Sequence, residues 1–332
     1  MKVAIIGAGT MGHGLALVYA LGGHQVAVTD TNAVTLANAP GLIDAACRSL
    51  AEAGEIPDGW FREQGAAAIR CTPDLPATVD GADLVIEAIT ERPDAKRALY
   101  ATLDTLLPAS ALLASNTSYL DVFPLIPAAR QARALIMHWY TPPYLVDLVD
   151  IVPGPHTDPA AIETARLIAC ALGKVPIVFT RFISGYVANR IQSAIALEVY
   201  RLLDEGVVSA HDIDQSVIHG LALRMPVLGV LAKADFTGLP LQRDALANRT
   251  YTPPPVRGHC DTIDRLLAEG HTGVMSGHGF FDWQGKTPEQ LFRERDRKLL
   301  ALKQAFRAVG PMLEQKTSRA TGSPVRREGR DL

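Results

Sequence analysis

The chain carries the stretch Lys2-Val3-Ala4-Ile5-Ile6-Gly7-Ala8-Gly9-Thr10-Met11-Gly12, an apolar β-branched run that leads directly into three glycines spaced G-x-G-x-x-G. The run predicts a strand, and the helical spacing of Met11, Leu15 and Val18 predicts a helix that begins at the turn. Asp30 ends the next predicted strand, eighteen residues after Gly12. Strand, turn, helix and acidic residue together predict a site for the pyrophosphate of a dinucleotide, and a glycine-rich turn without a ligand is the alternative.

Each position of this turn has a physical role. Gly7 lets the chain turn, Gly9 lets the backbone approach a pyrophosphate, and Gly12 lets the helix pack closely on the strand. Thr10 and Met11 lie at the helix N-terminus, where free N–H groups and the positive end of the helix dipole favour phosphate. We therefore expect these five residues to bind the cofactor.

Asp30 indicates which dinucleotide is bound. A carboxylate at this position accepts hydrogen bonds from a ribose 2′-hydroxyl and repels a 2′-phosphate. The chain has no arginine before Arg48 that could bind such a phosphate. The sequence therefore favours NAD over NADP.

Beyond the turn, the first 180 residues alternate β-branched runs with longer Ala- and Leu-rich segments, which is typical of a parallel sheet with helical crossovers. From Gly185 the apolar period becomes helical and predicts a long amphipathic helix. Thr287-Pro288-Glu289-Gln290 predicts another helix, with Thr287 as its N-cap. The expected strands lie at 2–6, 25–30, 83–89, 111–115, 134–138, 146–152 and 174–180.

These patterns predict an α/β fold, with a Rossmann-type doubly wound sheet followed by a smaller all-helical domain. We expect an NAD-binding domain at 1–183 and a helical substrate and dimerisation domain at 184–312. The last residues, 313–332, are polar and basic and are expected to be disordered.

Composition excludes several classes of protein. The 332 residues are enough for about two domains. A net charge of −3 offers no basic field for a nucleic acid. No apolar stretch reaches the ~18 residues of a membrane span, and no signal-peptide cleavage site follows the first strand, so we expect a soluble, cytoplasmic protein. The four cysteines form no C-x-x-C pair, so we expect reduced, buried thiols and no metal site.

Hydride transfer to NAD requires a residue that accepts the proton of the substrate hydroxyl. Of the nine histidines, His138 ends a predicted strand, at the sheet edge where open α/β sheets bind ligands. A carboxylate that held its ring in one tautomer would make His138 a general base. Asp150 and Asp147, both in the next predicted strand, are the candidate partners. A purely structural role for a single strand-end histidine is the alternative.

With these features in place, the sequence resembles the L-3-hydroxyacyl-CoA dehydrogenase family, with its L-gulonate 3-dehydrogenase and lambda-crystallin-like branches, over residues 1–283. Several matching blocks in order are more specific than any single block. The resemblance implies an NAD-dependent oxidoreductase that interconverts an L-3-hydroxyacyl-CoA and its 3-ketoacyl-CoA, a reaction of fatty acid metabolism. The blocks are 3–12, 83–88 with Glu91 and Lys96, 115–118, 138–142 with 148–152, 185–190 and 277–281.

The resemblance also implies roles for four catalytic residues. His138 matches the family's catalytic histidine, and Asp150 stands where the family has a glutamate that orients this histidine. Ser118 matches a serine that hydrogen-bonds the substrate oxygen, and Asn189 matches an asparagine that completes the site. Without the resemblance, Ser118 and Asn189 would be interpreted as cap or turn residues.

Three further residues are implied on the cofactor side. Glu91 and Lys96 match residues that line the nicotinamide ribose. Asn116 falls in the same matching blocks, and we expect it to contact the cofactor as well.

Three departures from the family bear on the substrate. Asp150 is one methylene shorter than glutamate, and Thr141-Pro142 replaces the family's usual Asn-Pro. Residues 31–70 hold three arginines against five acids, a net charge of −2 in the region where the family usually binds coenzyme A with lysines. A polyanionic tail would meet little attraction there, so the same chemistry on a small free hydroxy acid, such as L-gulonate or carnitine, is an alternative.

Other classes fit less well. The 6-phosphogluconate and β-hydroxyisobutyrate dehydrogenases rely on a lysine on the interdomain helix, and this chain has no lysine between Lys174 and Lys233. UDP-sugar dehydrogenases need a nucleophilic cysteine, for which Cys170 and Cys260 lack suitable neighbours. A catalytically silent NAD-binding protein is a further alternative. By analogy with the family, we expect a homodimer.

Overall fold

The structure is a computed structural model that describes residues 1–312. The tail predicted at 313–332 lies outside the described residues. Packing divides the chain into two units: unit 1 comprises Met1–Ala196 and Thr272–Ala301, and unit 2 comprises Leu197–His271 and the chain from Leu302 onward. This division follows contacts rather than chain order, and the predicted domain limits stay a prediction.

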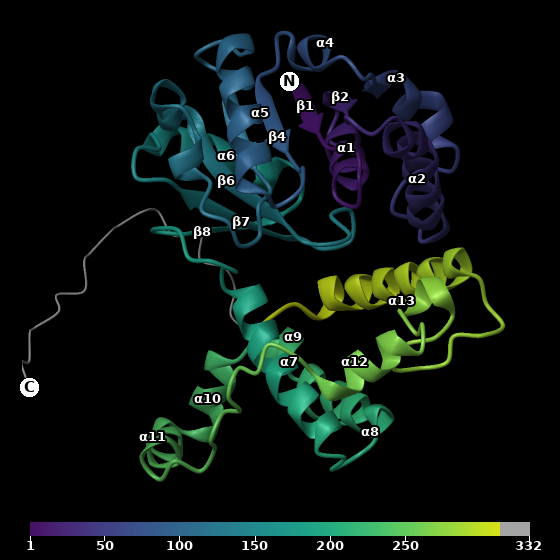
Figure 1. Cartoon of the computed structure of the whole chain (residues 1–332), viewed down its shortest axis with the longest axis vertical. Coiled ribbons are helices and arrows are strands. Elements are labelled where there is room, and N and C mark those ends of the chain that lie inside the picture. Colours follow the sequence, from purple (N-terminus) through teal and green to yellow (C-terminus); the bar gives the residue numbers. More distant parts are fainter. Residues whose placement is uncertain (313–332) are drawn as a thin grey trace, which may run out of the picture. The chain divides into compact units, whose positions relative to one another are not determined.

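Unit 1 is built on a mixed, mostly parallel eight-stranded sheet with the order β3-β2-β1-β4-β5-β6-β7-β8, which confirms the predicted α/β fold (Figure 1). The strands are β1 (Lys2–Ile6), β2 (Gln25–Thr29), β3 (Ile69–Cys71), β4 (Leu84–Glu87), β5 (Leu112–Ser115), β6 (Ala134–Trp139), β7 (Leu148–Pro153) and β8 (Val175–Val178).

The parallel register brings several strand ends to one edge. Ile6, the last residue of β1, lies beside Glu87 of β4, and Glu87 lies beside Ser115 of β5. Strand β6 runs parallel to β5 and carries His138 past the end of that register. The glycine turn and His138 therefore lie at the same edge of the sheet, where ligands bind in folds of this kind.

Two features of the sheet differ from the prediction. Strand β3 was not predicted, because its three residues have the charged Arg70 at the centre and form no apolar run. Strands β6 and β7 pair antiparallel, although helical crossovers and parallel strands were expected. Residues 140–147 are too few to hold the crossover that a parallel pair requires.

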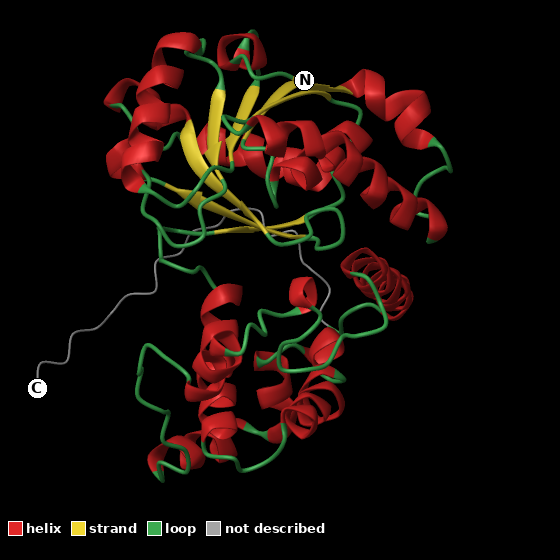
Figure 2. Cartoon of the chain, turned by 45° about the vertical axis from the view of Figure 1, so that its right-hand side comes forward, coloured by secondary structure: helices red, strands yellow, loops and turns green. Residues whose placement is uncertain are grey.

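Helices cover both faces of the sheet, as Figure 2 shows. On one face, α1 (Gly12–Leu21), α2 (Ala33–Glu52) and α6 (Pro159–Ala171) form a core with alternate strand residues such as Ile5. On the other face, α4 (Leu75–Val79) and α5 (Pro93–Leu106) pack against residues such as Ile6. Both faces of each central strand are buried, so the strands appear in the sequence as continuous apolar runs.

The predicted long helix is α7 (Ala188–Asp204), which begins three residues after Gly185. Gly185 and Tyr186 have positive φ and form a turn before it. Helix α13 (Pro288–Val309) has the predicted capping box, because Thr287 and Gln290 exchange side chain to backbone hydrogen bonds. The other helices are α3 (Ala66–Ala68), α8 (Ala210–Gln215), α9 (Met225–Leu228), α10 (Leu231–Thr237), α11 (Leu239–Ala247) and α12 (Asp261–Ala268), with π-helical turns at Phe61–Gly65 and Ser216–Ala222.

Within residues 1–312, no single helix is long and apolar enough to span a membrane. The bent pair Ala210–Leu228 and Leu231–Thr237 meets the same length and composition criteria when the two helices are taken together.

Candidate active site

The glycine turn between β1 and α1 has little room for side chains at two of its three glycines. Gly7 has a φ of +102°, and a Cβ there would lie 2.6 Å from the carbonyl oxygen of Ala88. A Cβ on Gly12 would lie 1.7 Å from the carbonyl oxygen of Gly7. A Cβ on Gly9 would meet no atom within 4 Å. The backbone at Gly9 is thus open to a ligand, and the turn fits the pyrophosphate of NAD.

Asp30 is held beside this turn, at the end of β2. One carboxylate oxygen accepts a hydrogen bond from the backbone N–H of Ala8 (2.8 Å), and the other accepts one from the backbone N–H of Asn32 (2.8 Å). These two bonds fix the carboxylate while leaving it half-buried. Its remaining lone pairs are available to a ribose hydroxyl.

The other two turn residues lie at the start of α1. Thr10 is exposed, and Met11 is the N-cap residue and makes no side-chain capping bond. The hydroxyl of Thr141 donates to the sulfur of Met11 at 3.0 Å. The turn is therefore in direct contact with the segment that follows His138.

Lys96 lies in a buried polar network rather than on an open edge. Its ammonium is 2.5 Å from a carboxylate oxygen of Glu87, and only 1% of its side chain is exposed. The hydroxyls of Tyr100 and Ser115 donate to the other oxygen of Glu87. The network pairs a buried ammonium with a buried carboxylate, and the role predicted for Lys96 at the nicotinamide ribose stays a prediction.

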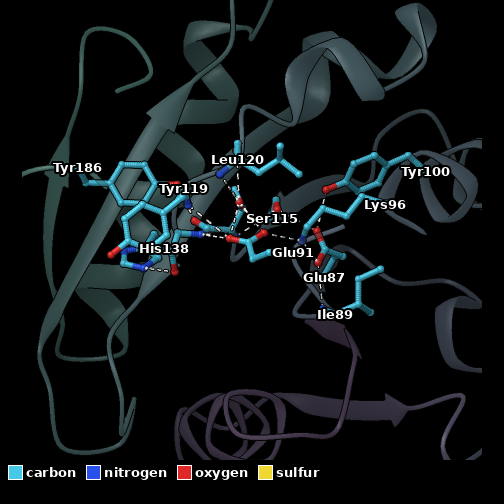
Figure 3. Close-up of polar contacts among 12 residues, drawn as sticks. Glu87, Ile89, Glu91, Lys96, Tyr100, Ser115, Tyr119, Leu120, His138 and Tyr186 are labelled. Atoms are coloured by element: carbon cyan, nitrogen blue, oxygen red, sulfur yellow. Dashed lines mark hydrogen bonds and ion pairs between the residues drawn. The ribbon is translucent and has the colours of Figure 1, made fainter. Parts of the chain in front are cut away.

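Glu91 connects this network to the loop that follows β5 (Figure 3). Its carboxylate accepts hydrogen bonds from the hydroxyl of Thr117 (2.8 Å) and the backbone N–H of Ser118 (2.5 Å), and it lies 3.4 Å from the ammonium of Lys96. The side chain is 41% exposed. Glu91 thus orders the loop after β5 and stays accessible to a cofactor.

The imidazole of His138 lies between two oxygen atoms. Its Nε2 is 3.1 Å from the hydroxyl of Ser118, and its Nδ1 is 3.4 Å from a carboxylate oxygen of Asp150. His138 and Asp150 are direct neighbours across the antiparallel pair of β6 and β7. The side chain of Asp150, although shorter than a glutamate, therefore reaches the ring at a distance that is at the long limit of a hydrogen bond.

Asp147, the other candidate partner, faces a different group. Asp147 directly precedes β7, and its carboxylate lies 3.6 Å from the ammonium of Lys174. Lys174 is buried and also donates to the backbone carbonyls of Pro143 and Val146. Of the two acids, the structure brings only Asp150 to His138.

Two tyrosines that the sequence analysis missed surround the same ring. The ring of Tyr186 lies 4.6 Å from that of His138, and its hydroxyl donates to the carbonyl of Thr117. Tyr140 contacts the imidazole edge-on at 4.6 Å and donates its hydroxyl to Asp150 at 2.6 Å. The signal that was available for Tyr140 is its spacing, because residues 138 and 140 of an extended strand share a face.

The two asparagines occupy different positions. Asn116 accepts a hydrogen bond from the backbone N–H of Trp139 through its side-chain oxygen, and so ties the ends of β5 and β6 together. Asn189 lies half-buried in the first turn of α7. The turn before α7 is bound to the loop that follows β5, because the backbone N–H of Gly185 donates to the carbonyl of Ser118. No contact of Asn189 with His138 is recorded among the described residues.

The four cysteines differ in burial. All four cysteines are free; Cys47 and Cys260 are buried, Cys71 is half-buried and Cys170 is exposed, so the expectation of buried thiols is wrong for Cys170. Within residues 1–312, no three His, Cys, Asp or Glu side chains are grouped to hold a metal ion.

A doubly wound sheet, an NAD-type glycine turn and a buried imidazole at the same edge define a nicotinamide-dependent dehydrogenase. Residues 2–182 match the NAD binding domain of the 3-hydroxyacyl-CoA dehydrogenases, and residues 185–283 match their C-terminal domain. The chain belongs to the 3-hydroxyacyl-CoA dehydrogenase family and is an NAD-dependent oxidoreductase.

The chain is similar to enzymes with different named substrates. It is 31% identical to 5-formyl-3-hydroxy-2-methylpyridine 4-carboxylate 5-dehydrogenase of Mesorhizobium japonicum, over 91% of this chain and 97% of the relative. A solved structure of a dehydrogenase of that name, described as an NAD+-dependent dismutase, has a TM-score of 0.81 at 29% identity and covers 92% of this chain and 98% of that chain. A solved (S)-3-hydroxybutyryl-CoA dehydrogenase from Ralstonia eutropha has a TM-score of 0.66 at 26% identity and covers 85% and 99%.

Proposed function

We propose that the protein oxidises the hydroxyl-bearing carbon of a small free hydroxy acid with NAD, and that His138 is the general base. The observation that carries this proposal is the contact of His138 Nε2 with Ser118, while Nδ1 faces Asp150. A ring held from one side by a carboxylate has its other nitrogen available for the substrate.

In this mechanism, Asp150 accepts the Nδ1–H of His138 and selects the tautomer with a lone pair on Nε2. The substrate hydroxyl binds beside this pair, within hydrogen-bond reach of both Nε2 and the hydroxyl of Ser118, which orients the oxygen. NAD, held by the glycine turn and Asp30, would supply the acceptor for the hydride of the carbinol carbon. His138 takes the hydroxyl proton at Nε2 in the same step, so the products are a carbonyl compound and an imidazolium paired with Asp150.

The charge of residues 31–70 supports a free acid over a coenzyme A thioester. The segment carries three arginines against five acids. Arg48 forms an ion pair with Asp44, and Arg70 donates to the carbonyl of Ala77. The similarity to a pyridine carboxylate dehydrogenase, with the higher of the two TM-scores, points the same way.

An acyl-CoA thioester is the second candidate substrate. The similarity to a 3-hydroxybutyryl-CoA dehydrogenase over 85% of the chain favours it. The chemistry at His138 would be the same, because both kinds of substrate present a hydroxyl to the base.

A substrate panel distinguishes the two candidates. NAD reduction would be measured with L-gulonate, carnitine, 3-hydroxybutyrate and a hydroxymethylpyridine carboxylate, and NADH oxidation with acetoacetyl-CoA. We expect turnover with at least one free acid and little with acetoacetyl-CoA. The reverse result would make the acyl-CoA thioester the substrate.

We also propose that a second copy of the chain covers unit 2, as expected from the family. Large apolar side chains are exposed there, among them Leu223 (75%), Leu231 (84%) and Leu246 (80%). A partner chain that covered these side chains would remove their apolar surface from water. Light scattering after size exclusion should give twice the mass of one chain, and a monomer at micromolar concentration would contradict the proposal.

The predicted cytoplasmic location and role in fatty acid metabolism stay predictions.

A further inference from the structure

Asp150 makes two unequal hydrogen bonds with the same carboxylate oxygen. The hydroxyl of Tyr140 lies 2.6 Å from this oxygen, whereas Nδ1 of His138 lies 3.4 Å from it. The first distance is that of a strong charge-assisted bond, and the second is at the long limit for an N–H donor. The carboxylate is therefore held mainly by Tyr140.

The strand geometry explains why both donors reach one oxygen. His138 and Asp150 are opposite each other in the register of β6 and β7, which fixes the distance between their backbones. Tyr140 follows His138 by two residues, so its side chain extends to the same face of the sheet. Its ring then lies edge-on against the imidazole, with 4.6 Å between centroids.

We propose that Tyr140 is a positioning residue that holds the carboxylate of Asp150 toward His138, and thereby compensates for an acid one methylene shorter than glutamate. The inference rests on the proposed function, in which His138 must keep its proton on Nδ1. Without Tyr140, the short carboxylate can rotate away from a partner that it barely reaches.

The environment of Tyr140 keeps its hydroxyl in the donor form. Burial, reinforced by the hydrogen bond to Asp150, raises the pKa of Tyr140 above its ordinary value. The phenol therefore stays protonated at neutral pH and donates its hydrogen bond to the carboxylate of Asp150.

The test compares Tyr140→Phe, Asp150→Glu and the double variant. In Tyr140→Phe, kcat should fall roughly fivefold to tenfold, less than for loss of the carboxylate itself because Tyr140 acts on His138 only through Asp150, while KM changes by less than about twofold. The imidazole ¹⁵N chemical shifts of His138 would be measured at a pH at which the ring is neutral. They should change from values typical of the Nδ1–H tautomer to those of a mixture that contains the Nε2–H tautomer. In the Asp150→Glu background, the same tyrosine change should have little effect, because glutamate reaches the ring unaided.

Tyr251→Phe is a matched control. The hydroxyl of Tyr251 also donates to a carboxylate, that of Glu198 at 2.8 Å, but this hydrogen bond is exposed and lies outside the sheet. Its removal should leave kcat and the His138 tautomer unchanged. Circular dichroism would check that each variant is folded.

The outcomes separate this inference from the proposed function. The tautomer is read without substrate, so a shift in Tyr140→Phe supports the inference even if no acid in the panel is oxidised. Unchanged ¹⁵N shifts in Tyr140→Phe would overturn it. An equal loss of kcat in the parent chain and in the Asp150→Glu background would also overturn it, because Tyr140 would then act independently of carboxylate length.

Discussion

At the residue scale, the site depends on which polar atoms face each other at the edge of the sheet. His138, Ser118 and Asp150 were predicted from strand ends and from the family resemblance, and the structure brings them together. Lys96 was predicted at the cofactor but is buried against Glu87. A sequence block shows that a lysine is present, but it does not show which carboxylate the lysine pairs with.

The two acids of β7 and its preceding turn give a prediction at this scale. Asp150→Asn should lower kcat roughly tenfold to a hundredfold, as expected for a lost hydrogen bond to a charged partner. Asp147→Asn should change kcat by less than about twofold, because Asp147 faces Lys174 instead. Steady-state NAD reduction by the two variants checks this, and the opposite order would show that Asp147 orients the base.

At the element scale, the strand–turn–helix unit was predictable because each glycine has a separate mechanical reason. The helix and strand limits follow the apolar runs to within a few residues. Strand β3 could not be predicted, because it is too short to show a pattern. The antiparallel pairing of β7 was missed, although the short connection from β6 leaves no room for a helical crossover. Tyr140 was missed because the strand was predicted to end at His138, so the two-residue spacing that places both side chains on one face was not considered.

Two glycine substitutions distinguish folding from cofactor binding. Gly9→Ala should change the free energy of unfolding by less than about 0.5 kcal/mol, because its Cβ meets no atom within 4 Å. It should still weaken NAD binding, since the methyl occupies the approach to the pyrophosphate. Gly12→Ala should destabilise the fold by about 3 kcal/mol or more, because its Cβ overlaps the carbonyl of Gly7.

Thermal unfolding and NAD titration by calorimetry measure both effects. Equal NAD affinity in Gly9→Ala and the parent chain would show that the backbone at Gly9 is not part of the phosphate site.

Helix α1 also contributes a pH dependence through His13. Burial lowers the pKa of His13, and the hydrogen bond to the carbonyl of Gly9 offsets only part of this effect. The unfolded chain therefore binds the proton more readily than the folded chain, so stability should decrease as the pH falls through about 6.5.

His13→Asn should reduce this loss of stability in urea unfolding curves at pH 7 and pH 5.5. His156→Asn removes an exposed histidine and is the matched control. The interpretation fails if His13→Asn and His156→Asn give the same pH dependence.

At the scale of the whole molecule, packing groups residues 272–301 with the sheet, and the limits of the two domains expected from the sequence stay a prediction. Tyr144 and Asp296, 152 residues apart, form a hydrogen bond within unit 1, and Leu300 is buried in its core. Contacts over such separations leave no period in the sequence.

The most direct test of this account is hydride transfer in His138→Gln. With the best substrate of the panel, kcat for NAD reduction should fall roughly a hundredfold to ten-thousandfold, the usual contribution of a positioned acid–base group. NAD affinity should be unchanged, because the glycine turn and Asp30 are intact. Turnover equal to that of the parent chain would contradict the account and leave only an NAD-binding fold without this base.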